Sequence, residues 1–206
     1  MSETIRGFKV YDDLIPEGYK PRDAKHITIE QNSRNILKSF TIIPEGIVML
    51  TLTGYNTTPF TNIEYPKSLR MIKIIGRERY RILQVSDINL PEYLHTLFLL
   101  NCEFIFDVKL PSNLHTLYLS GVHHCADFKL PPSLRILSSR SPHDNLDNLP
   151  PELEILITGY KKLPITNLPT TLKKIVLPYA LDHANMISNI KVPYGCEFMI
   201  TRYIDI

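Results

Sequence analysis

A short pattern headed by proline recurs seven times along this chain and restricts its possible folds more than any other feature. In the copy that begins Leu110-Pro111, leucines follow at positions 114, 117 and 119. The prolines are Pro44, Pro66, Pro91, Pro111, Pro131, Pro150 and Pro169, spaced 19 to 25 residues apart. A period in this range is typical of a solenoid, in which each unit buries its apolar edge against its neighbours.

Each copy predicts one corner followed by one strand. Pro111 fixes its own φ and pushes Leu110 into an extended conformation, so the chain turns before the leucines begin. Leu117 and Leu119 then face one side of the strand, while Thr116 and Tyr118 face the other. The returning segment 121–129 is too short for a capped helix. We therefore expect a repeat solenoid: a leucine-rich-repeat-like curved parallel β-sheet with extended or 3₁₀ convex segments and little α-helix.

The ends of the chain depart from the repeat, as the ends of a solenoid must. Residues 1–40 predict an N-terminal cap with a degenerate coil, in which 15–18 echo a repeat start and 26–30 alternate like a strand. Residues 41–190 carry the coils. Residues 191–206 predict a C-terminal cap coil that starts at Pro193, has a strand at 198–200 and closes with 201–206.

Composition favours a cytoplasmic protein that binds neither nucleic acid nor membrane. The net charge of +2, from 23 basic and 21 acidic residues, provides no basic stripe for a phosphate backbone. The longest apolar stretch, 97–106, is broken by Asn101 and Glu103 and is too short to span a bilayer. The N-terminus does not resemble a secretory signal, and three scattered cysteines favour reduced thiols.

The L-P-x-x-L-x-x-L-x-L unit at a period near 20 resembles the FNIP repeat, a leucine-rich-repeat relative abundant in social amoebae and giant DNA viruses. The resemblance covers roughly residues 40–200 and implies an interaction module, joined in some family members to F-box or kinase segments. A viral origin would place the protein in the host cytoplasm or the virion. The unit also resembles the Pro-rich leucine-rich repeats of secreted bacterial effectors, which open with L-P-x-x-L.

Motifs for catalysis, metal binding or cofactors are missing from the sequence, so we expect no enzyme, no metal and no cofactor. There is no Gly-rich phosphate loop, G-x-S-x-G or H-E-x-x-H. His123, His124 and Cys125 are adjacent and would point to alternate sides of an extended segment, so they do not form a ligand set. The cluster at 143–147 has no nucleophile at a spacing suited to catalysis and indicates a polar turn.

Apolar residues on the outward side of the strands predict a partner-binding surface. Phe98 and Tyr118 are the expected anchors, because aromatic residues are prominent in interface energetics. Aligning the repeats gives two outward rows. The middle row is Thr51, Lys73, Phe98, Tyr118, Ser138, Ile157 and Val176, and the first row is Met49, Met71, Thr96, Thr116, Ile136, Ile155 and Lys174. We expect both rows to face solvent, with Ile157, Val176, Thr96 and Thr116 completing the site. In the alternatives, a terminal segment covers this face, or the sheet merely tolerates Ile and Val.

One residue before the first row lies a polar entrance column. It contains Arg70, His95, His115, Arg135, Glu154 and Lys173. Five of its six members are basic or can become so, and His95, His115 and Arg135 are candidates to bind an anionic partner. The column is better explained as the solvated start of each strand, since charge runs on repeats are usually solvated.

These patterns favour a non-enzymatic protein–protein interaction module that uses the concave sheet of the solenoid. Two alternatives stay open: a substrate-recruiting receptor or effector for a ubiquitin ligase, and a structural protein of a large DNA virus. The expected partner is another protein of unknown identity. A homodimer through an exposed sheet edge or face is also compatible with the repeat.

Overall fold

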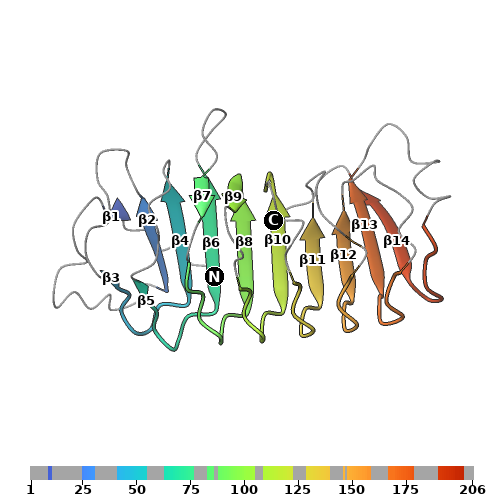
Figure 1. Cartoon of the computed structure of the whole chain (residues 1–206), viewed down its shortest axis with the longest axis horizontal. Coiled ribbons are helices and arrows are strands. Elements are labelled where there is room, and N and C mark those ends of the chain that lie inside the picture. The colour runs from blue at the N-terminus through green and yellow to red at the C-terminus, as the bar shows by residue number, and fades with distance from the viewer. Residues whose placement is uncertain are drawn as a thin grey trace, which may run out of the picture.

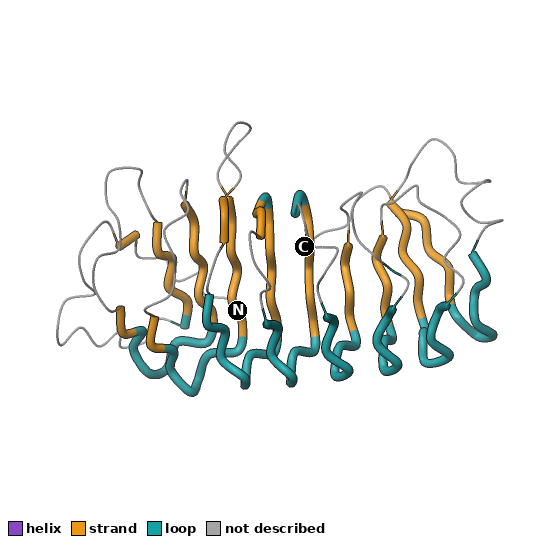
Figure 2. Tube along the Cα trace, in the orientation of Figure 1, coloured by secondary structure: helices purple, strands orange, loops and turns teal. Residues whose placement is uncertain are grey.

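The computed structural model is a parallel β-solenoid (Figures 1 and 2). It describes residues 9–10, 25–30, 41–54, 63–76, 83–85, 88–104, 109–122, 129–139, 146, 148–158, 167–178 and 190–201. These residues form strands, turns and extended segments and contain no helix. The prediction of a repeat solenoid with little α-helix is thus confirmed. Within the same residues, no helix has the length and apolarity needed to cross a membrane.

One ten-stranded sheet runs through the molecule, and its strands lie side by side in chain order (Figure 1). In order they are β1 (Lys9–Val10), β2 (His26–Glu30), β4 (Met49–Gly54), β6 (Met71–Gly76), β8 (Thr96–Leu100), β10 (Thr116–Ser120), β11 (Ile136–Ser139), β12 (Ile155–Thr158), β13 (Lys174–Pro178) and β14 (Glu197–Thr201). Every neighbouring pair is parallel. Each proline-headed repeat therefore contributes one strand.

Two small parallel sheets complete the described fold. β3 (Thr41–Ile42) pairs with β5 (Ile63–Glu64), and β7 (Leu83–Val85) pairs with β9 (Cys102–Phe104). The predicted strands at 26–30 and 198–200 are confirmed as β2 and β14, both in the main sheet. β1 was not predicted. The expected repeat start at 15–18 and the closing residues 202–206 lie outside the described residues.

A β-turn at each repeat proline forms the corner that the sequence predicts. The proline carbonyl accepts a hydrogen bond from the backbone N–H three residues later, as from Leu94 to Pro91 at 2.9 Å. The same bond occurs at Pro44, Pro66, Pro111, Pro131, Pro150, Pro169 and Pro193. Gly46 and Gly195, at the third turn position, have φ of 92° and 80°, as a type II turn requires. In the other six turns that position carries a side chain and φ is not positive.

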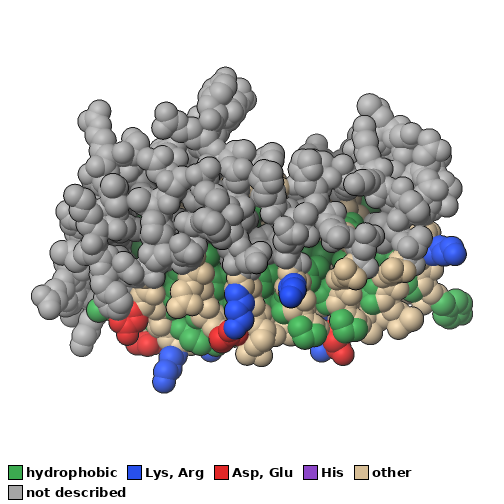
Figure 3. Space-filling model, viewed as in Figure 1, with side chains coloured by type: hydrophobic (Ala, Val, Ile, Leu, Met, Phe, Trp, Pro, Cys, Tyr) green, Lys and Arg blue, Asp and Glu red, His purple; other side chains and the backbone are tan. Residues whose placement is uncertain are grey.

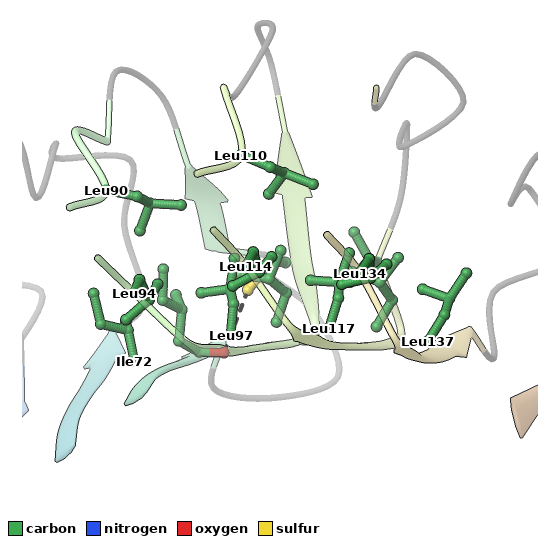
Figure 4. Close-up of a cluster of buried hydrophobic side chains, with 14 of the residues drawn as sticks. Ile72, Leu90, Leu94, Leu97, Leu110, Leu114, Leu117, Leu134 and Leu137 are labelled. Carbon is green, nitrogen blue, oxygen red and sulfur yellow. Dashed lines mark hydrogen bonds between the residues drawn. The ribbon is translucent and has the colours of Figure 1, made fainter. Parts of the chain in front are cut away.

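The core lies between the main sheet and the returning segments. Figure 4 shows leucines of successive repeats stacked on the inner side of the strands, with Leu90 and Leu110 packing from the returning segments. Leu94, Leu97 and Leu117 are fully buried, and each such side chain stabilises the fold by roughly 1.5–3 kcal/mol. The regularly spaced apolar side chains of the repeats thereby form one continuous core.

Two polar residues interrupt one inner row of this core. Ser139 aligns with Leu119 and then with Thr158, where the repeat would place leucine. Both are almost completely buried. The Thr158 hydroxyl has no hydrogen-bond partner among the described residues. Because an unpaired buried hydroxyl costs free energy, Thr158 stabilises this row less than a leucine at the same position would.

Candidate functional site

The register of the main sheet places both outward rows as the repeat alignment predicts. In the middle row, Lys73 pairs with Phe98, Phe98 with Tyr118, and Tyr118 with Ser138. The remaining pairs follow in the same order through Val176, and the first row is aligned from Met49 to Lys174. The structure extends the middle row by Thr28 and Lys9 at one end and by Met199 at the other. Repeat alignment alone was sufficient to find the neighbours from Thr51 to Val176 and from Met49 to Lys174.

Phe98 and Tyr118 form an aromatic stack at the centre of the middle row. Their ring centroids are 4.5 Å apart and the ring planes differ by 3°. Adjacent strands lie about 4.8 Å apart, so side chains in the same rotamer stack at this distance. The Lys73 ammonium lies 5.6 Å from the Phe98 centroid, within range of a cation–π interaction. Both rings are half-buried, which leaves part of each surface available for contact.

The prediction that the whole outward face is open to solvent is wrong for four of the proposed contact residues. Thr96, Thr116, Ile157 and Val176 are buried, with exposed fractions of 6% to 9%. Small and β-branched side chains in a central strand are shielded by neighbours about 4.8 Å away on each side. Two other members of the middle row, Thr51 and Ser138, are buried as well. Larger half-buried members of the first row, including Ile136 and Ile155, offer more surface.

The imidazole rings of His95 and His115 lie within hydrogen-bond distance of the two threonine hydroxyls. Nδ1 of His95 lies 3.1 Å from the Thr96 hydroxyl, and Nδ1 of His115 lies 3.0 Å from the Thr116 hydroxyl. The two rings are stacked, with centroids 4.5 Å apart and planes at 15°. Burial, followed by the charges of His95 and Arg135, lowers the pKa of His115. The structure thus brings both predicted histidines together in a form that disfavours protonation of His115.

Ion pairs and backbone contacts offset the cationic character of the rest of the entrance column. Glu154 pairs with Arg135, and also with Lys173 through Nζ–Oε2 at 2.8 Å. Hydrogen bonds from Lys173 and then Arg135 lower the pKa of Glu154. Nη1 of Arg70 donates to the carbonyl of Lys67 at 2.7 Å. The charged side chains of the column thus contact neighbouring residues and do not form a row of free cations.

Side-chain hydrogen bonds between successive turns form a ladder that the sequence analysis missed. Ser133 Oγ donates to the carbonyls of Ser112 and Leu114 in the preceding turn, at 2.7 and 2.8 Å. Thr171 Oγ1 makes the same pair of bonds, to Pro151 and Leu153 at 2.7 and 2.9 Å. The sequence signal is a serine or threonine immediately before the first leucine that follows the repeat proline.

Charged side chains are interspersed along these turns. In Figure 3, described basic and acidic side chains are mixed along the margin where the turns lie. Lys109 Nζ lies 3.8 Å from Oε1 of Glu92, whose other oxygen, Oε2, accepts from the Ser112 backbone N–H at 3.0 Å. The bond from this N–H, followed by one from the Ser112 hydroxyl, lowers the pKa of Glu92. These contacts join the turns of adjacent repeats.

The described residues contain no group of three or more His, Cys, Asp or Glu side chains positioned for a metal ion. His123, His124 and Cys125 lie outside the described residues, as does the cluster at 143–147 apart from Leu146. Cys102 is fully buried and its thiol lies 3.2 Å from the Leu100 carbonyl. Burial raises the pKa of this thiol to about 12, so it is not activated as a nucleophile.

Comparison with known proteins yields no match, either to a family model or to a curated protein.

Proposed function

We propose that this chain is a non-enzymatic protein-binding module that presents the outward face of its main sheet to another protein. The observation that supports the proposal most directly is the half-buried stack of Phe98 on Tyr118. Two pre-stacked rings lose little conformational freedom on binding and offer a large apolar surface. The resemblance of the repeat to FNIP and leucine-rich repeats supports the same proposal.

The surroundings of the stack suggest the chemistry of the partner. Half-buried apolar side chains lie on the same face in the strands around it: Met49, Met71, Ile75, Leu100, Ile136 and Ile155. Lys73 is the single charged residue within β4, β6, β8, β10, β11 and β12. We therefore expect a partner surface that is mainly apolar, with an acidic group that reaches Lys73.

The proposal is tested by comparing three immobilised proteins: wild type, Phe98→Ala with Tyr118→Ala, and Tyr194→Ala. Tyr194 is fully exposed in a turn beside β14, so its replacement removes an aromatic ring elsewhere. We expect wild type and the Tyr194 variant to capture the same protein, and the double variant to bind it at least tenfold more weakly by calorimetry. Equal affinity of all three for every captured protein would rule out this face.

The identity of the captured protein separates the functional alternatives. Ubiquitin-ligase subunits would favour a substrate receptor or effector, and capsid or core proteins would favour a structural role in a virus. Lys73→Glu provides a further check, since reversing the single charge in the strands around the stack should weaken binding to an acidic partner.

A further inference from the structure

Exposed apolar side chains are concentrated in the last described coil of the solenoid. The exposed large apolar residues of the described chain are Ile42, Tyr93, Val192, Tyr194, Met199 and Ile200. Four of these six lie between residues 190 and 201. A solenoid end normally carries polar residues, because its core rows would otherwise meet water. The C-terminal coil does not follow this rule.

The exposure arises because the rows of the solenoid continue into β14 without a neighbour beyond it. Ile200 aligns with the fully buried Leu177, yet it is 40% exposed. Met199 is 36% exposed beside Val176, which is 7% exposed. Among the described residues, no strand pairs with the outer edge of β14, which lies at one end of the sheet in Figure 1.

We propose that the outer edge of β14 pairs antiparallel with β14 of a second copy of this chain. A two-fold axis through Met199 pairs all five residues of the strand. Phe198 then lies opposite Ile200 of the second copy, on the inner face of both sheets, and Met199 lies opposite its own counterpart. The inner apolar rows of the two solenoids become continuous, and the contact is isologous and closed.

A second β14 fits this edge better than an unrelated peptide strand, because its own residues match the positions that the edge presents. An added strand must have apolar residues at the two inner positions, and β14 has Phe198 and Ile200 there. The same register places Glu197 opposite Thr201 of the second copy, so the two glutamates do not face each other. Glu197 also lies 3.9 Å from Lys174 within its own copy, which partly neutralises its charge.

The first test is the molar mass in solution, by light scattering over a dilution series. We expect wild type to show twice the monomer mass of 23.8 kDa and to dissociate on dilution. Met199→Lys places two ammonium groups against each other on the axis and should leave only monomer. Ile42→Lys makes the same kind of change at an exposed apolar residue in β3 and should still dimerise. A monomeric wild type, or a dimeric Met199→Lys protein, overturns the proposal.

The second test fixes the register. In a Cys125→Ser, Cys196→Ser background, Met199→Cys brings two thiols within disulfide range across the axis. Glu197→Cys is the matched control, because its two thiols would be four residue positions apart along the strands, about 13 Å. We expect mild oxidation to crosslink the first variant and not the second. Equal crosslinking of both, or of neither, rules out this pairing.

Discussion

The ring of Phe98 lies parallel to the ring of Tyr118, with centroids 4.5 Å apart and planes within 3°. The two residues are twenty positions apart in sequence and are direct neighbours in the register of β8 and β10. Their stack is therefore a direct consequence of the shared register of the strands. A slip of one residue in that register would place one ring on the inner face and separate the pair.

The stack should contribute to stability as well as to the proposed binding face. A double-mutant cycle with Phe98→Leu and Tyr118→Leu is expected to give a coupling free energy of about 0.5–1.5 kcal/mol in urea unfolding. Phe98 with Ile157, three strands away in the sheet order, is the control pair and should show coupling close to zero. Zero coupling for Phe98 with Tyr118 would mean that the rings do not interact in solution.

Acid should destabilise the solenoid through His115. Its folded-state pKa is lowered by burial and by the neighbouring His95 and Arg135, against the opposing charge of Glu154. The unfolded chain therefore binds this proton more readily, so the stability contribution is complete above pH about 6.5 and is lost as the pH falls through the lowered pKa. The urea midpoint of His115→Gln should fall less than that of wild type between pH about 7.5 and about 5.5. Parallel curves for the two proteins would contradict the assignment.

The hydrogen bonds between turns should be measurable at Ser133. Ser133→Ala removes two bonds to the preceding turn and leaves the partly buried Leu114 carbonyl without this donor, at a cost of about 1–3 kcal/mol in unfolding free energy. Thr171 makes the equivalent bonds through its own hydroxyl, so Ser133→Thr should restore most of the loss. If Ala and Thr at this position are equally stable, the ladder carries no net stability.

Gly121 should tolerate substitution less well than Gly46, although both have positive φ. A Cβ on Gly121 would clash with the Asn101 side-chain oxygen, whereas one on Gly46 would meet open space. Gly46→Ala therefore costs only the backbone strain of about 1–2 kcal/mol, and Gly121→Ala should cost more. Asn101→Gly should recover part of that difference when combined with Gly121→Ala. Thermal unfolding of the four proteins tests this order.

The repeat alignment predicted the neighbours of each residue better than it predicted their exposure. It paired Phe98 with Tyr118 and His95 with His115, because the shared register is a property of the repeat itself. It placed Thr96 and Val176 in solvent, because alternation gives the face of a strand and not the size of the side chains beside it. The hydrogen-bond ladder at Ser133 and Thr171 had a sequence signal that the alignment did not use, namely a hydroxyl residue directly before the first leucine after the proline.

The sequence by itself determined the solenoid, its parallel sheet, the corners at the prolines and the rows across the strands. Those features depend on local backbone preferences and on the period of the repeat, both of which can be read from the sequence. Only the tertiary structure decided which outward residues remain accessible, that Glu154 pairs with Arg135 and Lys173, and that β14 carries exposed apolar residues. Those properties depend on what lies next to each side chain in space, and neighbouring strands supply it from residues about twenty positions away.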